Sequence, residues 1–469
     1  MSVKSPPGGG FAVSAPLVII GAGAAGLCAA LAAHEAGVET VVLERDSMPR
    51  GSTALSAGLI PAAGTRFQKL LGIADSPALF ATDLKRKAHD EADPAIVDLI
   101  AREAGPTIEW LTDRYGLPFS VVHDFDYPGH SVRRMHGLPT RSGAELIDRL
   151  RQAAEEAAIP IIVDAIATAL YAGAERFVRG VEITRPDGGR DWLGCRALVL
   201  ACNGYGGAPD LVARYIPEMN GALYFGHPGN RGDAVLWGQA LGAKLLHMSG
   251  YQGHGSVAHP HGILVTWAAI MEGGFQVNES GVRFSDESLG YSEQAAVVLA
   301  QPGGVAFDIF DERIAAIARQ FEDFRQAEAS GAVIEAPTIE QLAKRLNLPA
   351  SALAQSFAEV EQAKHAGARD RFGRSFAGVA PLSPPFKAVK VTGTLFHTQG
   401  GVAVDEQARV MSAQGLQLPN LFAAGGAAAG ISGSRASGYL SGNGLLTATV
   451  LSRIGGLSAA ALVKSFDAP

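Results

Sequence analysis

The sequence contains few cysteines, no excess of positive charge and no haem attachment motif. Its three cysteines, Cys28, Cys195 and Cys202, are widely spaced, which indicates neither a disulfide framework nor a cysteine metal knuckle. No Cys-x-x-Cys-His segment occurs, so a covalently attached c-type haem is not expected. The net charge is −7 with acids and bases interspersed, which argues against a nucleic-acid surface. We therefore expect small-molecule partners, no metal site and no nucleic acid.

The chain also lacks long apolar segments. Residues 1–16 contain Pro and Gly but no apolar stretch of a signal peptide, and the longest apolar runs fall short of the roughly 18 residues that span a bilayer. Hydrophobic residues make up 47% of the sequence, so most of it should fold, and 469 residues suit two or three domains. We expect a soluble, cytoplasmic protein without a membrane partner.

The most specific motif lies near the N-terminus. An apolar stretch leads into Gly21, Gly23 and Gly26, and a second apolar stretch ends in Glu44. Glycines at a strand-to-helix turn leave the first amides of the helix open to a pyrophosphate. A carboxylate about 20 residues later can accept both ribose hydroxyls, which favours adenosine without a 2′-phosphate. This order of elements, a strand, a turn, a helix and a second strand that ends in Glu44, predicts a dinucleotide site. The alternative is an ordinary βαβ turn without a ligand.

A loop of small residues follows this unit over residues 49–58. Such a loop can lie flat against a wide aromatic cofactor, with the hydroxyls of Ser52 and Thr53 available to its heteroatoms. The alternative is a linker rich in Gly and Ser.

Further along, residues 77–156 have mostly helical apolar spacing, interrupted by a segment rich in Pro, Gly and His at 123–143. The turn Asp187-Gly188-Gly189 between two strand patterns predicts a small β-meander. Its last strand ends in small residues at 201–207, which lets loops gather at the carboxyl edge of a parallel sheet, where ligands bind.

The βαβ rhythm is lost between about residues 250 and 385. Charged helical stretches are expected at 311–329 and 338–366. We interpret this part as an inserted second domain and expect boundaries at 1–246, 247–385 and 386–469.

Taken in order, these segments resemble the flavoprotein superfamily that contains fumarate reductase, urocanate reductase and 3-ketosteroid dehydrogenase. The resemblance implies an α/β fold: a Rossmann-like FAD-binding domain of the glutathione reductase type with an inserted α+β capping domain. It implies extended FAD with its adenine end at Gly21–Glu44 and the amides near Asn443 directed at the pyrimidine edge of the flavin. A positive helix end there stabilises reduced, anionic flavin.

The resemblance also implies how FAD is held. Covalently flavinylated relatives carry His in the early loop, whereas Ser52 stands at the matching place, so we expect non-covalent FAD. Relatives often show Glu where Gly426 stands, so ribityl recognition should differ. The cofactor-binding residues implied are Gly21, Gly23, Ala24, Ala25, Gly26, Glu44, Arg45, Gly51, Ser52, Thr53, Ala57, Gly58, Ala167, Ala201, Cys202, Asn203, Gly232, Asp233, Gly425, Ser441, Gly442, Asn443 and Leu445.

The substrate end departs from fumarate reductases. Their proton-donating Arg aligns with Ile270, and isoleucine cannot deliver a proton. His254 and His397 match the histidines that touch the substrate carboxylates in those enzymes; the alternative for each is a structural histidine.

Tyr439 lies in a segment that resembles the ketone-binding stretch of 3-ketosteroid dehydrogenases, where a phenol and a glycine amide hold the ketone oxygen. Two such donors stabilise the enolate that forms when an α proton leaves. Arg435 lies near the position of a carboxylate-clamping Arg in fumarate reductases. Tyr439 and Arg435 together predict a substrate with a ketone and a carboxylate, such as an oxocyclohexane carboxylate. The alternatives are a packing or surface role for Tyr439 and an exposed Arg435.

The general base has no deciding motif, and the candidates are Tyr251, His254, Tyr127 and Tyr291. Our first hypothesis is an FAD-dependent dehydrogenase that desaturates a ketone by hydride transfer to flavin N5 and passes electrons to an unidentified acceptor or to oxygen. The second is an ene-reductase of an unsaturated (di)carboxylate, and the third is a non-catalytic flavin-binding protein, which Ile270 favours.

Overall fold

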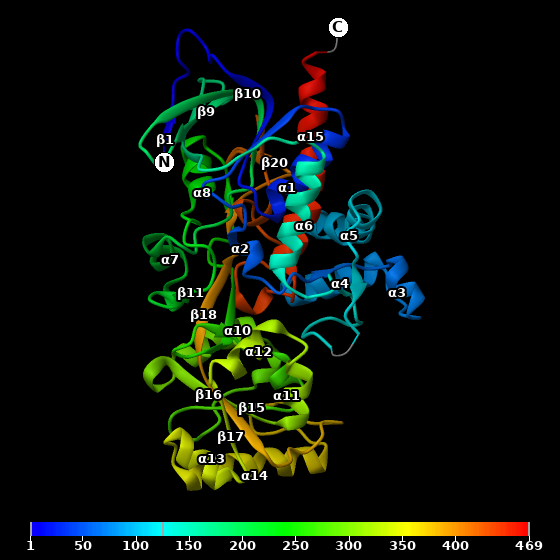
Figure 1. Ribbon diagram of the computed structural model, residues 1–469, viewed down its shortest axis with the longest axis vertical. Coiled ribbons are helices and arrows are strands. Elements are labelled where there is room, and N and C mark those ends of the chain that lie inside the picture. The colour runs from blue at the N-terminus through cyan, green and yellow to red at the C-terminus, as the bar shows by residue number, and fades with distance from the viewer. Residues whose placement is uncertain (1, 124–125, 468–469) are drawn as a thin grey trace.

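A computed structural model describes residues 2–123 and 126–467 of the chain. The molecule is elongated, with two sheets arranged along its long axis and both chain ends beside the larger sheet (Figure 1). The long strand β18 (Phe386–Thr398) runs between these two parts.

The larger sheet has nine strands in the order β1-β8-β9-β10-β2-β3-β7, with β21 paired to β10 and β20 paired to β21. The strands β21, β10, β2, β3 and β7 are parallel neighbours, so their carboxyl ends share one edge. The core of β2 is apolar on both faces because both faces are covered, as expected for a parallel sheet. The bounds are β1 (Ser2–Lys4), β2 (Ser14–Ile20), β3 (Thr40–Leu43), β7 (Ile161–Ile162), β8 (Ile166–Ala172), β9 (Val178–Thr184), β10 (Arg190–Leu200), β20 (Arg409–Met411) and β21 (Gln417–Ala423).

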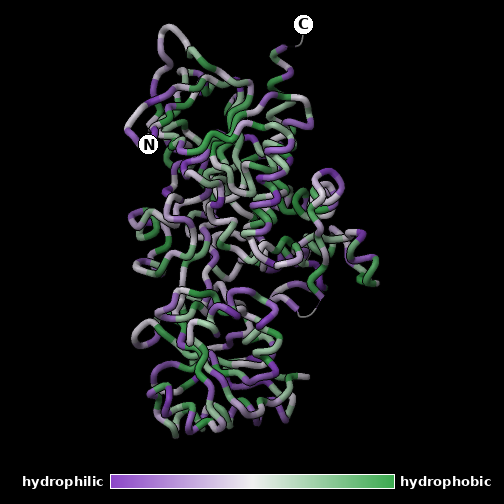
Figure 2. Tube along the Cα trace, viewed as in Figure 1, coloured by the Kyte–Doolittle hydropathy of each residue, from purple (hydrophilic) through white to green (hydrophobic). Residues whose placement is uncertain are grey.

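Helices pack beside this sheet and bury its apolar residues (Figure 2). The helix α1 (Ala24–Glu35) packs along α15 (Asn443–Ser465), so the first and last helices of the chain are neighbours. The predicted helical spacing over residues 77–156 is confirmed by three helices. The bounds are α2 (Gly51–Ala54), α3 (Arg66–Leu70), α4 (Pro77–Lys87), α5 (Pro94–Tyr115), α6 (Gly143–Glu156), α7 (Pro209–Tyr215) and α8 (Asp233–Ala240).

The predicted meander is present as β8, β9 and β10, which are antiparallel. The turn predicted at Asp187-Gly188-Gly189 joins β9 to β10, and the Arg185 amide donates to the Gly189 carbonyl at 2.9 Å. Gly188 has a φ of +86°, a conformation that favours glycine.

The second sheet has seven strands in the order β14-β13-β18-β16-β15, with β11 and β17 also paired to β18. Helices α13 and α14 lie at its far end (Figure 1). The boundaries expected at 246 and 385 stay predictions; β11 and β18 join this sheet from outside them. The bounds are β11 (Leu223–Tyr224), β13 (Tyr251–Ala258), β14 (Ile263–Leu264), β15 (Phe275–Val277), β16 (Val305–Asp311), β17 (Val333–Ala336), α9 (Ala268–Met271), α10 (Tyr291–Leu299), α11 (Glu312–Ala318), α12 (Glu322–Ala329), α13 (Ile339–Leu346) and α14 (Ala350–Ala366).

Each long helix predicted in the second part is divided in two. The stretch 338–366 breaks at Asn347, which has a φ of +57° and ends α13, and Pro349 then precedes α14. The backbone conformation of Asn347 and the proline at 349 therefore end one helix and precede the next, although the apolar spacing of the sequence continues across them. Short elements complete the fold: β4 (Ile60–Pro61), β5 (Ser120–Val121), β6 (Met135–Gly137), β12 (Leu245–Leu246), β19 (Gly401–Val402) and the 3-10 turns η1 (Pro217–Met219), η2 (Glu287–Leu289), η3 (Pro302–Gly304), η4 (Gly425–Ala427) and η5 (Ala436–Gly438).

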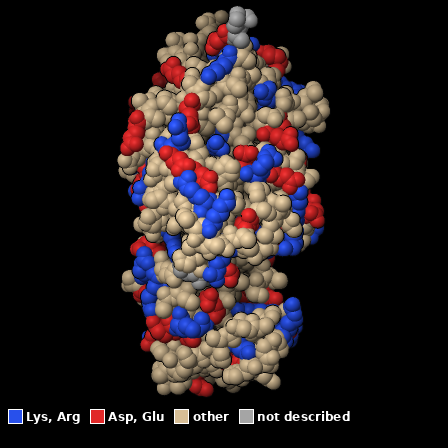
Figure 3. Space-filling view, turned by 90° about the vertical axis from the view of Figure 1, so that its right-hand side faces the viewer, with Lys and Arg blue, Asp and Glu red and all other residues tan. Residues whose placement is uncertain are grey.

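The helix α15 is long and apolar enough by composition to cross a membrane, with a mean hydropathy of 1.5 over its most apolar window. In this fold 61% of that window is buried, and α15 packs against α1 and α5 as a core helix does. On the face shown in Figure 3, positive and negative side chains are intermixed rather than separated by sign.

The side chain of Asn420 on β21 connects the antiparallel part of the larger sheet, at β9, to β10, which pairs with β21 at its carboxyl end. Its buried side chain accepts a hydrogen bond from the Val178 amide (2.9 Å) and donates to the carbonyls of Val178 (2.7 Å) and Arg196 (2.8 Å). Buried backbone groups that lose a partner are costly.

We expect Asn420→Leu to destabilise the fold by about 3 kcal/mol, because three backbone groups lose their partner inside the sheet. The measurement is the urea midpoint at fixed FAD concentration. Gln417→Leu, at an exposed position of the same strand, is the matched control and should change stability by less than about 0.5 kcal/mol. Equal effects of the two substitutions would contradict this role for Asn420.

Candidate active site

A cavity of about 600 Å³ lies between the carboxyl edge of the larger sheet and the second sheet. It is lined at one end by Glu44 at the end of β3 and at the other by Tyr439 and the start of α15. The loop 51–58, the strand ends at 201–203 and residues of β13, β14 and α12 line the space between. The cavity therefore has an elongated shape with contributions from both sheets.

The β2–α1 turn leaves its side of the cavity open. Gly21 has a φ of +104°, and a Cβ there would lie 2.5 Å from the Ala201 carbonyl oxygen, so only glycine fits. Gly23 is the N-cap of α1 without any capping side chain, and Ala24 and Ala25 line the cavity. The Ala24 amide donates to Thr53 Oγ1 at 3.0 Å, which connects α1 to the small-residue loop. This end offers helix amides to an anion.

Glu44 is buried beside this turn. Its carboxylate accepts hydrogen bonds from the amides of Ala22 (2.8 Å) and Asp46 (3.0 Å). Burial raises the pKa of Glu44, and these backbone hydrogen bonds act against the rise. Glu44 is thus held rigidly at the cavity wall, where the sequence predicts a ribose.

Residues 227–233 contact Arg45 and Ser52 and add polar groups to the same end of the cavity. Arg45 donates to the Gly229 carbonyl and lies 3.4 Å from a carboxylate oxygen of Asp233. The other carboxylate oxygen of Asp233 is buried without a hydrogen-bond partner among the described residues, and burial raises the pKa of Asp233. Ser52 accepts from the His227 amide (3.0 Å) and the Asn230 side chain (2.8 Å). A buried polar atom without a partner inside a cavity is a binding position for a ligand donor.

The opposite end of the cavity is built by the start of α15. Its N-cap, Gly442, has a φ of +86° and no capping side chain, and Gly442, Gly444 and Leu445 line the cavity. Two uncapped helix starts and an orphaned carboxylate oxygen fit a long, anionic, hydrogen-bonding cofactor such as FAD.

Two neutral histidines line the substrate end. Nδ1 of His254 accepts from the Ser256 amide at 3.1 Å, and Nδ1 of His397 accepts from the Gln399 side chain at 2.8 Å. Burial lowers the pKa of His254 to about 3 and that of His397 to about 4. Each neutral ring therefore keeps its proton on Nε2 and is a hydrogen-bond donor there.

Two phenols complete this end. The Tyr439 hydroxyl oxygen accepts a hydrogen bond from the Gly444 amide at 3.2 Å, which leaves its own proton for a ligand. Tyr291, at the start of α10, meets Tyr439 edge to face with ring centroids 6.2 Å apart. Burial raises the pKa of both phenols, whereas hydrogen bonds from Gly444 to Tyr439 and from Ser441 to Tyr291 lower it. Both side chains are neutral donors at physiological pH.

Aromatic rings form one wall of the substrate end. His254 stacks between Tyr291 (4.9 Å between centroids) and Phe396 (5.3 Å), and Phe396 stacks on Phe225 (4.6 Å). Trp267 meets His254 edge-on at 5.6 Å. This wall suits a flat, apolar substrate.

Most of the predicted cofactor residues line the cavity, but some do not. A Cβ on Gly26 would lie 1.7 Å from the Gly21 carbonyl oxygen, and a Cβ on Gly232 would lie 2.5 Å from Leu211, so both glycines serve packing. Asn443 is fully buried and donates to Ser432 Oγ at 3.0 Å. Lining residues are Gly21, Gly23, Ala24, Ala25, Glu44, Arg45, Gly51, Ser52, Thr53, Ala57, Gly58, Ala167, Ala201, Cys202, Asn203, Asp233, Gly425, Ser441, Gly442 and Leu445.

Two of the five predicted catalytic residues lie away from the cavity. The Arg435 side chain is 64% exposed and its Nε lies 2.8 Å from Glu91, so the structure gives no support to a carboxylate clamp at this position. Tyr251 points to the other face of β13 because strand side chains alternate, and it belongs to a buried hydrophobic cluster together with Tyr205. Tyr439, His397 and His254 do line the cavity, whereas Ile270 does not.

Sequence reasoning missed several residues of the site. Phe225, Phe396 and Trp267 lie on three separate segments, so no local motif joins them. Gln252 lines the cavity two positions before His254, and strand alternation could have identified it. Arg141, just before α6, donates a hydrogen bond to Gln320 in the segment between α11 and α12, and both Arg141 and Asp323 line the cavity.

The fold and the cavity together define an FAD-dependent oxidoreductase. The chain belongs to the FAD binding domain family, whose profile matches residues 17–445. It binds FAD as its cofactor, and its relatives act on carbon–carbon bonds.

Known proteins of similar sequence are reductases. A probable fumarate reductase of Shewanella frigidimarina is 29% identical over 95% of this chain and 74% of its own length. Urocanate reductase of Eggerthella lenta is 26% identical over 97% of this chain and 76% of its own length.

Solved structures of two enzyme types share the fold. The open conformation of a flavocytochrome c3 fumarate reductase is 28% identical with a TM-score of 0.81, and the match covers 97% of this chain and 79% of that one. The 3-ketosteroid-Δ4-(5α)-dehydrogenase of Rhodococcus jostii is 24% identical with a TM-score of 0.76, over 97% of this chain and 99% of that one. The predicted superfamily and fold class are thereby confirmed.

We expect Gly23→Val to weaken FAD binding at least about tenfold without unfolding the protein. The backbone of Gly23 is extended, and a Cβ would have only Thr53 Oγ1 near it, at 3.4 Å, so the added side chain occupies the cavity instead of the core. The measurement is FAD affinity by fluorescence titration of the apoprotein. Gly9→Val, at a position with open space around it, is the control. An unchanged affinity for FAD in Gly23→Val would show that the pyrophosphate does not bind at the β2–α1 turn.

Proposed function

We propose that this oxidoreductase interconverts a neutral ketone and its α,β-unsaturated enone. The observation that carries the proposal is a substrate end lined by neutral hydrogen-bond donors: the phenols of Tyr439 and Tyr291 and the Nε2–H groups of His254 and His397. Neutral donors stabilise the negative charge that develops on a ketone oxygen as it becomes an enolate. FAD, when bound, accepts or donates the hydride at the carbon β to the carbonyl.

Tyr439 is the proposed donor to the ketone oxygen. The Gly444 amide occupies a lone pair of its hydroxyl oxygen and so directs the phenolic proton away from α15. Because the pKa of Tyr439 is raised by burial, this group holds its proton and contributes a hydrogen bond rather than a full proton transfer.

Tyr291 is the proposed group that exchanges the α proton. Two observations argue against two of the four candidates for this group: Tyr251 does not line the cavity, and the acceptor nitrogen of His254 is engaged by the Ser256 amide. Tyr127 and Tyr291 both line the cavity, and burial raises the pKa of each. Ser441 opposes part of this rise in the pKa of Tyr291. We therefore favour the neutral Tyr291 phenol as the group that donates the α proton in the direction of enone reduction and receives it back in desaturation.

A neutral substrate follows from the placement of the cations. Among the described lining residues the permanent cations are Arg45, which is paired with Asp233, and Arg141 on the capping side. A keto acid was predicted on the strength of Arg435, which is paired with Glu91 at the surface. We therefore propose the ketone without the carboxylate.

The second candidate is reduction of an unsaturated carboxylate, and two observations favour keeping it. The sequence relatives of this chain include a probable fumarate reductase and a urocanate reductase. Arg141 also lines the cavity and could bind a carboxylate through its guanidinium. The electron acceptor, oxygen or another partner, remains a prediction, as do the non-covalent attachment of FAD and a cytoplasmic location.

Anaerobic mixing with candidate ketones and enones tests the proposal. We expect a cyclic ketone to bleach the oxidised flavin band without added reductant, or its enone to reoxidise the reduced flavin. Tyr439→Phe should slow either half-reaction by about a hundredfold or more, because the enolate oxygen loses a preorganised donor. Tyr215→Phe, outside the cavity, is the control and should react like the parent protein. A flavin that responds to neither compound class would contradict the proposal.

Arg141→Gln separates the two candidates. A neutral ketone makes no use of the guanidinium, so its KM should change by less than about threefold, whereas the KM of a carboxylate substrate should rise by about tenfold or more on loss of a charged hydrogen bond. The measurement is steady-state KM with paired substrates that differ only in the carboxylate. A larger effect on the ketone than on the acid would refute this assignment.

A further inference from the structure

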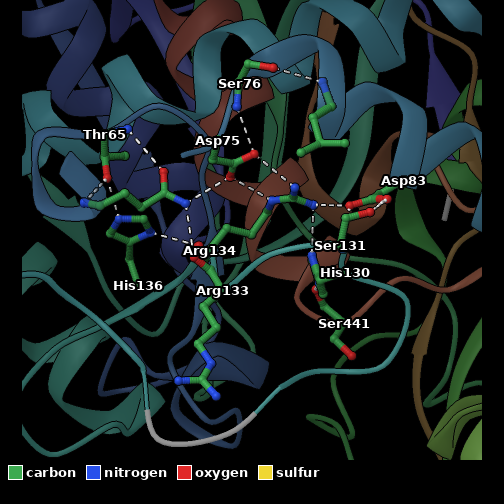
Figure 4. A network of polar contacts seen from close by, with 12 residues as sticks. Thr65, Asp75, Ser76, Asp83, His130, Ser131, Arg133, Arg134, His136 and Ser441 are labelled. Atoms are coloured by element: carbon green, nitrogen blue, oxygen red, sulfur yellow. Dashed lines mark hydrogen bonds and ion pairs between the residues drawn. The ribbon is translucent and has the colours of Figure 1, made fainter. Parts of the chain in front are cut away.

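A buried polar network connects Arg134, Asp75, Asp83 and His130 to Ser441 (Figure 4), and of these five residues only Ser441 lines the cavity. At its centre is the fully buried guanidinium of Arg134, which forms two hydrogen bonds of 3.0 Å with Asp75 and one of 2.5 Å with Asp83. Asp83 also accepts hydrogen bonds from the amide and hydroxyl of Ser131. A buried charge surrounded by two carboxylates is held in one geometry, because any displacement leaves a charge without a partner.

Arg134 also fixes the tautomer of His130. Its Nη1 lies 3.3 Å from His130 Nδ1, and a guanidinium can only donate, so Nδ1 is the acceptor. The ring proton is then on Nε2, which lies 3.0 Å from the Ser441 carbonyl oxygen and donates to it. Burial, followed by the charge of Arg134, lowers the pKa of His130 to about 4, so the ring stays neutral.

Ser441 is where this network reaches the cavity. It lies between Tyr439 and Gly442, the N-cap of α15, and it lines the cavity. Its carbonyl is held by His130, and its side chain lies close enough to the Tyr291 phenol to lower the pKa of that phenol. One residue therefore links the buried network to the helix start that faces the cofactor and to the phenol at the substrate end.

We propose that His130 is a positioning residue: through the Ser441 carbonyl it fixes the first amides of α15 toward the flavin and the Ser441 hydroxyl toward Tyr291. This role rests on the proposed function only for its effect on Tyr291. Its effect on α15 concerns the cofactor alone, because correctly placed helix amides stabilise reduced flavin.

A pair of variants with similar shape tests the role. His130→Gln keeps an acceptor for Arg134 and a donor for Ser441, whereas His130→Met keeps the length but has no N–H donor. Arg133→Ala is the matched control, because the Arg133 side chain points away from the network (Figure 4) and pairs with Asp126. All variants are compared as FAD-loaded protein with measured flavin occupancy.

The first measurement is the flavin midpoint potential, which needs no substrate. We expect His130→Met to disfavour reduction about tenfold, which is about 30 mV for a two-electron couple, and His130→Gln and Arg133→Ala to stay near the parent value. If His130→Met does not fold, His130→Asn replaces it, because its shorter side chain keeps the polarity without the reach to Ser441. A parent-like potential in the donorless variant would overturn the role of His130 at α15.

The second measurement is the half-reaction with a ketone or enone that the parent protein turns over. We expect kcat to fall about tenfold in His130→Met with KM within about twofold, and His130→Gln to restore it. A shifted potential without any ketone turnover in the parent would leave the positioning role standing and refute the proposed substrate. Parent-like kcat together with a parent-like potential in His130→Met would overturn the positioning role itself.

Discussion

The structure depends on two helices that begin, without side-chain caps, at one cavity. Glycine is the N-cap of both α1 and α15, and the two helices pack against each other along their lengths. Helix amides without a cap carry partial positive charge and need a partner. Because α1 and α15 are neighbours in one core, the distance between the two helix starts is set by packing. A ligand that satisfies both must therefore be long and must carry negative or electron-rich groups at two fixed places, as FAD does.

Neutral histidines connect the protein interior to this cavity in a repeated manner. One ring nitrogen of His397 accepts a hydrogen bond from the side-chain amide of Gln399. The side-chain oxygen of Gln399 accepts a hydrogen bond from Ser432, and the Ser432 hydroxyl oxygen accepts one from Asn443 at the first turn of α15. In His130 one nitrogen accepts from Arg134 and the other donates to Ser441. In both cases burial keeps the ring neutral, and an interior donor decides which nitrogen carries the proton. The hydrogen bond from the interior donor thus makes the other ring nitrogen of each histidine a donor. The two histidines belong to hydrogen-bond networks that reach the start of α15 at Asn443 and at Ser441.

The sequence predicted what is encoded locally. Gly21, Gly23 and Glu44 lie within one βαβ unit, so spacing alone reports their geometry, and the turn at Gly188 is equally local. Arg435 was predicted in the site because it lies near Tyr439 in the sequence, whereas in the structure it pairs at the surface with Glu91, more than 300 residues away. The position proposed for His130 could not be predicted from the sequence for the same reason: Arg134 is near His130 in the sequence, but the Ser441 carbonyl is 311 residues away. Contacts that join distant segments leave no periodic signal.

The distribution of charge supports the proposal of a substrate unlike fumarate. A dicarboxylate that leaves water needs cations to replace its hydration, since an uncompensated buried charge costs several kcal/mol. Here Glu44, Asp233 and Arg45 lie toward the predicted ribose end, and the phenols, neutral imidazoles and stacked rings gather at the substrate end. Such a surface pairs well with one oxygen atom and a flat hydrocarbon, because each donor can approach the oxygen and the rings contact the carbon skeleton. The proposed neutral carbonyl substrate therefore rests on the donors and rings of this end, and Arg141, which also lines the cavity, is the charged group that would serve a carboxylate instead.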